Sequence, residues 1–398
     1  MRPNILWIVT TQWRAQAFGF AGDVNVRTPC LDALARQSVQ YTEATTPHPF
    51  GPFARAALIT GIESPANGVR NYHDPLPAGL PTIAQSMLDR SYETFFFGKW
   101  HLARRDPAAA LVGEAHARMI VPPESRGGFQ FWEGFEGGFQ LNNPWLHGTR
   151  LPEPQRFAGY QSDVVCGRAA GLLGGLAGPW FAVVSLESPH PPYAAPAAGF
   201  PPLNPAALTL GPNVPVEAAA RARAELSGYY AHAQATDRAI GALVAGLPEE
   251  TIIVFTSVHG DMHGAHGRFR KGWPYEESVR VPLLVRAGGI ASRDARAISL
   301  VELPALTLSW AEDRRAVPAG RGDWAKISMP SVVELADQCD RAWTGLRSPG
   351  RKLVLWPDGS PWLFFDLADD PHELRNLVAV PARRAEMEGL RERLRTLR

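Results

Sequence analysis

Short apolar runs alternate with longer amphipathic segments along most of the chain. The runs are rich in β-branched and aromatic side chains and predict buried strands of the parallel type at 5–9, 93–98, 180–187, 251–257 and 281–287. Between them, the segments 82–90, 160–173 and 217–247 have the apolar spacing that is typical of helices. This alternation predicts an α/β fold in which a central, mostly parallel (mixed) sheet carries helices on both faces.

The last part of the chain breaks this alternation. The segment 312–350 is rich in turn residues, and the sequence KLVLWPDGSPWLFFDL that follows it predicts a hairpin closed by Asp358 and Gly359. An arginine-rich helix ends the chain. We therefore expect an α/β domain over residues 1–311, a turn-rich connection over 312–350 and a small C-terminal α+β subdomain over 351–398.

The composition is that of a globular chain with long loops. The 398 residues are 45% hydrophobic, which is enough to bury a large core and excludes a disordered chain. The 37 glycines and 36 prolines favour long connections between the elements. The formal net charge of +1 gives no overall attraction to nucleic acid, so we expect no such partner and look for a local charge cluster instead.

The cysteines and the longest apolar stretch bear on the cellular compartment. Cys30, Cys166 and Cys339 have no paired spacing, so the sequence predicts neither a disulfide framework nor a thiolate zinc site. The first strand begins so early that we expect no signal sequence ahead of it. Glycines and Pro179 interrupt the stretch 171–186, which is therefore not a membrane span. We expect a cytoplasmic protein without a membrane partner.

The ends of four predicted strands carry polar side chains. In a parallel sheet, ligands bind just beyond the carboxyl ends of the strands. The residues at these ends are Thr10-Thr11-Gln12, Lys99-Trp100-His101, Ser188-Pro189-His190 and Val258-His259-Gly260-Asp261. Three of the four ends carry a lysine or an imidazole, so we expect the functional site at this edge of the sheet.

Several segments, in the same order along nearly the whole chain, resemble those of the sulfatase family within the alkaline phosphatase superfamily. They include PNILWIVT at the start, RAALITG, FGKWH, SPHPPY and HGDMHGAHGRFRKG. The resemblance implies the sulfatase fold. It also implies hydrolysis of sulfuric esters by a formylglycine, made from the first residue of a Cys/Ser-x-Pro-x-Arg motif, together with bound calcium.

The motif that should supply the nucleophile departs from the family pattern. In the sequence HPFGPFARAALITG, counting back from Arg55 places the nucleophile at Gly51 and the motif proline at Phe53, and Ala54 replaces a common serine. Glycine has no side chain to oxidise. Since removal of a covalent nucleophile costs on the order of 10⁶ in rate in a well-studied hydrolase, we expect no turnover through formylglycine.

The calcium positions depart from the family as well. By this resemblance, the residues of this chain at the calcium positions are Thr11, Gln12, Val258 and His259. Calcium takes roughly six to eight oxygen ligands, mostly from carboxylates, and these four residues offer no carboxylate. We therefore expect no calcium, and no other cofactor.

The cationic residues of the family site remain. Arg55, Lys99, His101, His190 and Lys271 match residues that, in family members, contact the sulfate group, the nucleophile or the leaving oxygen. By this resemblance we expect Lys99, His101, His190 and Lys271 to be catalytic, while Arg55, His259 and Gly51 bind a small anionic substrate. In the alternative interpretation, the basic groups are solvated or paired with nearby acids and have no chemical role.

Other residues near the same edge allow further interpretations. The group His259, Asp261, His263 and His266 could hold a transition metal, and Thr10 or Thr11 could supply a substitute hydroxyl nucleophile. His73 and Asp74 could act as an acid-base pair, with His48 in the pocket wall. We expect Trp145 and His147 to lie on an inserted loop that shapes specificity.

Three functions fit these residues. The first is an atypical enzyme of sulfatase fold that acts on a small sulfate- or phosphate-bearing substrate without calcium or formylglycine. The second is an inactive pseudo-sulfatase that binds an anionic ligand or a protein partner. The third is an ordinary sulfuric ester hydrolase. The sequence leaves open the choice between sulfate and phosphate, because both are tetrahedral anions bound by the same donors, and it leaves open the oligomeric state.

Overall fold

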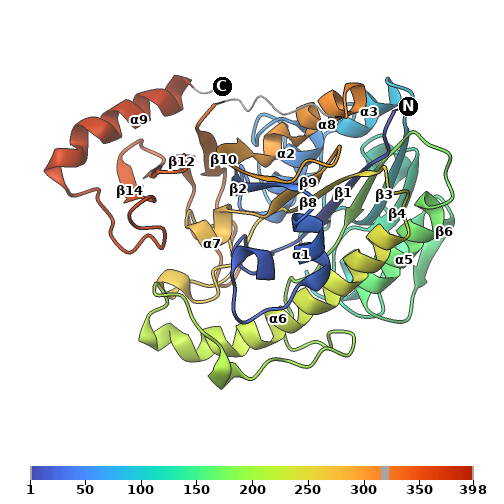
Figure 1. The fold of residues 1–398 in the computed structure, drawn as a ribbon, viewed down its shortest axis with the longest axis horizontal. Coiled ribbons are helices and arrows are strands. Elements are labelled where there is room, and N and C mark those ends of the chain that lie inside the picture. Colours follow the sequence, from blue (N-terminus) through green and yellow to red (C-terminus); the bar gives the residue numbers. More distant parts are fainter. Residues whose placement is uncertain (1, 315–321, 397–398) are drawn as a thin grey trace.

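A ten-stranded sheet runs through the centre of the molecule (Figure 1). The structure is a computed structural model that describes residues 2–314 and 322–396. In these residues the strand order is β10-β2-β9-β8-β1-β7-β3-β4-β5-β6. The strands are β1 (Ile5–Thr10), β2 (Val39–Thr45), β3 (Glu93–Lys99), β4 (Phe131–Phe135), β5 (Trp145–Gly148), β6 (Leu151–Arg156), β7 (Trp180–Ser185), β8 (Ile252–Ser257), β9 (Leu283–Arg286) and β10 (Ser292–Ser299).

Helices cover both faces of this sheet (Figure 1). One face packs against α2 (Gly51–Thr60), α3 (Ile83–Leu88) and α8 (Leu303–Glu312), and the other against α1 (Pro29–Ala35), α5 (Gln161–Leu173) and α6 (Val216–Ala245). The short helices α4 (Glu114–Ala117) and α7 (Glu276–Val279) lie in connections.

Alternate side chains of β1 pack into two separate hydrophobic cores, one on each face of the sheet. Ile5, Trp7 and Val9 of β1 belong to the core under α2, α3 and α8, whereas Leu6 and Ile8 belong to the core under α1, α5 and α6. Successive side chains of a strand point to opposite faces, so a strand that is apolar at every position can only be buried on both sides. The predicted fold class is confirmed.

Two local predictions were wrong. The run at 281–287 was expected to be a parallel strand, but β9 is antiparallel to both β2 and β8. A strand buried on both faces is apolar throughout in either direction, so its direction does not show in the composition. The region of Trp145 and His147 was expected to be an inserted loop, but it forms β5, which pairs with β4 and β6.

A second sheet lies in the C-terminal part of the chain. Its four antiparallel strands, in order, are β11 (Ala325–Met329), β12 (Trp343–Arg347), β13 (Arg351–Leu355) and β14 (Pro361–Asp366). Helix α9 (Arg384–Thr396) packs on it through Met387, Leu390 and Leu394. The predicted hairpin is present as β13 and β14.

The expected connection over 312–350 was wrong in its secondary structure, because β11 and β12 lie inside it and extend the second sheet. Loops rich in proline and glycine flank these two short strands, and this hides their pattern in the sequence. Residues 315–321 of this segment lie outside the described residues. Across the described ranges, no helix is both long and apolar enough to cross a bilayer.

A buried group of charges joins the second sheet to the main body. Glu276 of α7 accepts hydrogen bonds from Arg347 at 3.0 and 2.8 Å and pairs with Lys352 at 2.8 Å. Burial would raise the pKa of Glu276, but the neighbouring Arg347 and Lys352 hold it well below its usual value. The carboxylate is therefore charged, and it needs both cations.

Glu276→Gln should destabilise the protein strongly. Removal of this carboxylate leaves Arg347 with Glu43 alone and Lys352 with Glu373 alone, and loss of one member of a buried ion-pair group costs about 3–5 kcal/mol. Urea denaturation measures the change in the free energy of unfolding. The control is Glu392→Gln, whose partner Arg395 is exposed and which should change stability by less than about 1 kcal/mol. Equal effects of the two changes would contradict the role given to Glu276.

Candidate active site

A cavity of about 110 Å³ opens at the carboxyl ends of the central strands. Lys99 ends β3, and loops that follow β1, β7 and β8 supply Thr11, His190 and His259. Gly51 begins helix α2 at the floor of the cavity, where Pro52 fixes the backbone for a first helical turn. The remaining lining residues are Phe50, Tyr72, His101, Phe139, Pro191, Arg270, Lys271, Leu335 and Gln338.

The structure brings together six of the seven residues that the sequence places in the site. Gly51, Lys99, His101, His190, His259 and Lys271 all line this one cavity. No carboxylate is among the lining residues in the described part of the chain. The predicted convergence of these residues at one edge of the sheet is therefore observed, while the functional site itself and the role of each residue stay predictions.

Arg55 lies behind the cavity wall. Its guanidinium donates to the hydroxyls of Thr11 at 2.9 Å and Ser185 at 2.6 Å, and to the carbonyl of Lys99 at 3.1 Å. These partners hold three strand ends together. The geometry thus favours a positioning role for Arg55 over the direct contact with substrate that we expected.

Lys99 is paired with a carboxylate that the sequence analysis missed. Its ammonium lies 2.6 Å from Glu187 Oε1, and both side chains are almost fully buried. Burial lowers the pKa of Lys99 to about 8, against the opposing effect of Glu187. Lys99 also lies over the ring of Phe139 at 4.9 Å. The ammonium of Lys99 therefore lines the cavity, whereas its partner carboxylate, Glu187, does not.

Lys271 is held by neutral partners. Its ammonium donates to Gln12 Oε1 at 2.6 Å and to His190 Nε2 at 3.2 Å. Gln12 in turn donates to Asp261 Oδ2 at 2.5 Å, so the nearest negative charge lies one side chain away. Burial, and then repulsion by Lys99, lower the pKa of Lys271 to about 7. At neutral pH this ammonium would gain from an added anion.

The charges around the cavity leave a positive excess. Five cations stand against four carboxylates: Arg55, Lys99, Arg105, Arg270 and Lys271 against Glu136, Glu187, Glu225 and Asp261. Burial raises the pKa of Glu136 to about 7 and lowers that of Lys271 to about 7, so near neutral pH these shifts weaken both sides of the balance. Since buried charges are costly without a partner, the cavity favours an anion.

Hydrogen bonds fix the tautomers of the three imidazoles. Arginine only donates, so Nε2 of His101, 2.6 Å from Arg105, accepts, and Nδ1 carries the proton. His190 and His259 each donate through Nδ1 to a backbone carbonyl, at 2.8 and 2.9 Å. Burial holds the pKa of all three imidazoles well below the usual value, so they are neutral at pH 7.

Two of these imidazoles keep a free nitrogen. Within the described residues, neither the Nδ1–H of His101 nor Nε2 of His259 has a hydrogen-bond partner, and both atoms are buried. The first is a donor and the second an acceptor. A Cβ built on residue 51 would lie 3.0 Å from Nδ1 of His101, so this donor faces the space that Gly51 leaves open.

The donor set does not fit calcium. The Thr11 hydroxyl donates to the Leu186 carbonyl and accepts from Arg55, and Gln12 Oε1 accepts from the ammonium of Lys271. Val258 offers no side-chain oxygen, and the nearby Asp261 Oδ2 accepts hydrogen bonds from Gln12 and Tyr193. Calcium needs several free oxygen ligands, and here a protein ammonium already takes the available amide oxygen.

The transition-metal site considered for His259, Asp261, His263 and His266 does not form, because these side chains do not have metal-ligand spacing. His263 is buried against Tyr229 and Tyr193, and its Nε2 lies 3.9 Å from Asp261. His266 instead lies with Glu277 and Glu373, and these three side chains are the one group in the described ranges with metal-ligand spacing. Beside them, the Lys352 ammonium lies 2.6 Å from Glu373, so an ammonium already balances that carboxylate.

The other candidates lie in structural roles or outside the cavity. His48 accepts from the Ser64 amide at 2.8 Å and contacts Ser328, so it ties the C-terminal sheet to the main body. The Asp74 carboxylate accepts two backbone amides of its own turn, and neither His73 nor Asp74 lines the cavity. His147 accepts from the amide of Val121 at 2.7 Å.

Two residues around the site were missed from the sequence. Glu187 and Arg105 hold Lys99 and His101 respectively. Each has a signal in hindsight: Glu187 lies three residues before His190, and Arg105 four residues after His101. Gln12, expected only at a calcium position, holds Lys271 instead. Spacing alone does not say which neighbour turns inward.

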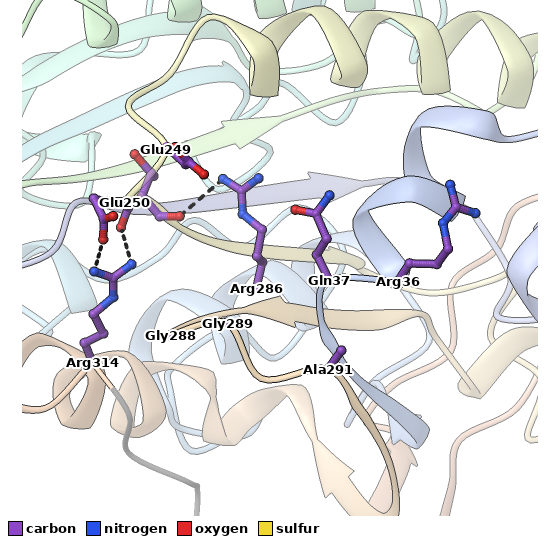
Figure 2. Close-up of a pocket in the computed structure, with 10 residues that line it drawn as sticks. Arg36, Gln37, Glu249, Glu250, Arg286, Gly288, Gly289, Ala291 and Arg314 are labelled. Carbon is purple, nitrogen blue, oxygen red and sulfur yellow. Dashed lines mark hydrogen bonds and ion pairs between the residues drawn. The ribbon is translucent and has the colours of Figure 1, made fainter.

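A larger cavity, of about 500 Å³, lies at the opposite edge of the sheet (Figure 2). Arg36, Glu249, Arg286 and Arg314 line it. Figure 2 shows Arg314 pointing to Glu250, with which it forms an ion pair. The strands β2, β8 and β10 begin at this edge, and no imidazole lines this cavity in the described part of the chain, so its size does not make it the candidate active site.

The fold and the cavity define an α/β protein with a buried cavity, lined by cationic side chains and imidazoles, at the carboxyl edge of its sheet. A model of the sulfatase family matches residues 3–313. This chain therefore belongs to the sulfatase family.

Individual relatives cover nearly the whole chain. An ulvan-active sulfatase of Formosa agariphila is 38% identical over an alignment 422 residues long. The alignment covers 99% of this chain and 80% of that protein. The crystal structure of yidJ from Bacteroides fragilis, 25% identical, superposes with a TM-score of 0.85 over 99% of this chain and 95% of that one. A structure solved with its substrate D-glucosamine-2-N,6-O-disulfate, 19% identical, shares the fold with a TM-score of 0.81 and covers 97% of that chain.

Sulfate binding should weaken as the pH rises above 7. Lys271 is protonated below its pKa of about 7 and loses its charge above it, so affinity should fall up to about tenfold per pH unit, and more steeply above the pKa of about 8 of Lys99. Calorimetric titration with inorganic sulfate from pH 6 to 9 measures this. Lys271→Met should abolish the step near pH 7, whereas the surface variant Lys326→Met should keep it. A sulfate affinity that does not change with pH in the wild type would contradict the binding of sulfate by Lys271.

Gly51→Ala should lower the affinity for sulfate. The added methyl group would lie 3.0 Å from His101 Nδ1 and occupy the space that this donor faces. The same titration measures the loss, which we expect to be about tenfold or more. The control is Gly389→Ala in α9, where a new Cβ meets no atom within 4 Å among the described residues. Unchanged affinity in Gly51→Ala would show that the anion lies elsewhere.

Proposed function

We propose that this protein hydrolyses a sulfate or phosphate ester without formylglycine and without calcium. The observation that supports this most is the composition of the cavity. The buried ammonium groups of Lys99 and Lys271 and three neutral imidazoles surround a space that Gly51 leaves without a side chain. Ammonium groups and N–H donors are the partners that a tetrahedral oxyanion needs. The name of the Formosa relative makes a sulfate ester the first substrate to test.

The two lysines would bind the charged group of the ester. Among the described residues, the ammonium of Lys271 contacts Gln12 and His190 and no carboxylate. Lys99 keeps Glu187 on its far side. Arg270, held by Glu225 at 2.6 and 3.2 Å, lines the same cavity. Fixed positive charges in a water-poor site stabilise negative charge as it grows in the transition state.

The tautomers and charges assign a base and an acid. Nε2 of His259 is a free acceptor and can take a proton from an attacking water. The Nδ1–H of His101 is a free donor that can hydrogen-bond the leaving oxygen, and the ammonium of Lys271, whose pKa burial lowers to about 7, can protonate that oxygen. The water oxygen bonds to sulfur or phosphorus as the bond from that atom to the ester oxygen breaks. The products are an alcohol and the free sulfate or phosphate. His259 then releases its proton to solvent and Lys271 regains one.

This scheme replaces both the positive charge of a metal ion and the covalent nucleophile. Lys271 supplies positive charge at a place where Gln12 offers an amide oxygen and no carboxylate. A water next to Gly51 takes the place of a side-chain nucleophile. General acid-base catalysis of this kind is worth about 10²–10⁴ in rate, which is less than covalent catalysis provides. We therefore expect slow turnover.

Turnover of 4-nitrophenyl sulfate or 4-nitrophenyl phosphate tests the proposal. Activity should survive EDTA, because no step uses a metal. His259→Gln and Lys99→Met should each lower kcat/KM about 100-fold or more. The control His372→Gln changes an exposed histidine outside the cavity and should leave activity unchanged.

Three results would contradict the proposal. Activity that collapses on chelation would indicate a metal-dependent sulfatase. Activity that Lys99→Met leaves unchanged would place the chemistry elsewhere. Anion binding that depends on Lys271, without any turnover, would support the binding-only alternative. In that case a ligand would raise the melting temperature in proportion to its affinity but yield no product.

A further inference from the structure

The cavity has room for the sulfate group of a substrate but not for a large group attached to it. Its volume is about 110 Å³, and aromatic side chains close much of its wall. Phe139 stacks on His190 with ring centroids 4.4 Å apart, and Phe50 lies 5.5 Å from the ammonium of Lys271. The remainder of a larger substrate must therefore lie against the surface beside the opening.

The loop 335–341 supplies part of the cavity wall. Leu335 and Gln338 line the cavity. Backbone bonds fix this loop to the active-site lysine: the Lys271 amide donates to Gln338 Oε1 at 3.3 Å, and the Cys339 amide donates to the Lys271 carbonyl at 3.1 Å. The loop thus has a defined place at the opening.

A stacked pair of tryptophans lies next to this loop. The rings of Trp356 and Trp362 have centroids 4.5 Å apart at 24°, and Arg341 lies over both at 5.4 and 5.6 Å. We call these three residues the Trp–Arg surface. All three are half-buried. Asp340, the carboxylate that pairs with Arg341 at 2.6 Å, is itself 65% exposed, so it is a weak competitor for an anion.

Strand register places this surface at the active-site end of the second sheet. Leu355 pairs with Thr344, so Trp356 lies beside the start of β12. There Trp343 donates through its indole N–H to the carbonyl of Gly272, at 2.8 Å, one residue from Lys271. The surface and the cavity are therefore linked by two short, hydrogen-bonded segments.

Core packing does not account for Trp356. Trp362 packs against the main core, but Trp356 belongs to none of the buried hydrophobic clusters of the described residues. A large aromatic ring that is left half-exposed beside a guanidinium is a common feature of binding surfaces. The ring offers an apolar face, and the guanidinium offers planar N–H donors for a sulfate or carboxylate group.

We propose that the Trp–Arg surface binds a neighbouring sugar unit of an anionic saccharide whose sulfate ester enters the cavity. The apolar C–H face of a pyranose would stack on Trp356, and Arg341 would bind an acidic substituent of the same unit. Exposed Arg268, whose guanidinium lies 4.4 Å from the ring of Trp273, adds positive charge nearby. This inference rests on the proposed function only in placing the ester in the cavity.

Binding of sulfated oligosaccharides tests the inference. The probes are ulvan and ι-carrageenan oligosaccharides, titrated calorimetrically beside inorganic sulfate. At least one oligosaccharide should bind the wild type more tightly than sulfate does. Trp356→Ala and Arg341→Ala should each weaken that binding about tenfold, and Arg341→Ala should also reduce its dependence on salt. Neither change should alter the affinity for inorganic sulfate.

The matched control is Trp324→Ala. Trp324 also contacts an arginine, with Arg393 5.6 Å from its ring, but it lies at the other end of the second sheet, since the adjoining Ala325 pairs with Arg347. This variant should bind the oligosaccharide normally. Melting temperatures of all variants show whether a loss of binding reflects unfolding.

The outcomes separate this inference from the proposed function. If Trp356→Ala and Arg341→Ala bind the oligosaccharide as the wild type does, while Lys271→Met does not, the surface has no binding role and the cavity keeps its own. If neither oligosaccharide binds more tightly than sulfate, the inference is also overturned. If sulfate fails to bind the wild type, the proposed anion site fails, whatever the saccharide does.

Discussion

The candidate active site depends on the hydrogen bonds that hold the buried ammonium of Lys271. An ammonium away from water is costly unless other groups satisfy it, and here an amide oxygen and an imidazole do so without cancelling its charge. The amide group of Gln12 then carries the polar contact on to Asp261. This arrangement keeps the charge available at the wall, and it accounts for a cavity lined by cations and imidazoles rather than by carboxylates.

The surrounding structure holds this charge in place through backbone geometry. Arg55 ties the ends of β1, β3 and β7 together, so Thr11, Lys99 and Ser185 keep fixed positions. The N-terminus of α2 brings Gly51 against His101, and Arg105 sets the tautomer of that imidazole from the other side. Several side chains of the cavity, among them Lys99, His101 and Lys271, are therefore held by partners outside it, as a preorganised site requires.

The sequence located the edge of the sheet but not the pairings at it. The run Lys99-Trp100-His101 follows a buried strand, and parallel strands end at one edge, so convergence with His190 and His259 could be predicted. The pairing of Lys99 with Glu187, and the withdrawal of Arg55 behind Thr11, could not, because they depend on side-chain directions set by packing. The domain boundaries and the cytoplasmic location stay predictions.

By itself, the sequence determined the fold class and the residue types of the site. Period-two and helical spacing follow from backbone geometry, and the residues at positions 51, 99, 101 and 271 are fixed by covalent order. Only the tertiary structure decided the direction of β9, the protonated nitrogen of each imidazole and the place of Trp356 beside the start of β12. These depend on contacts between segments far apart in the chain, whose energies arise only when the chain has folded.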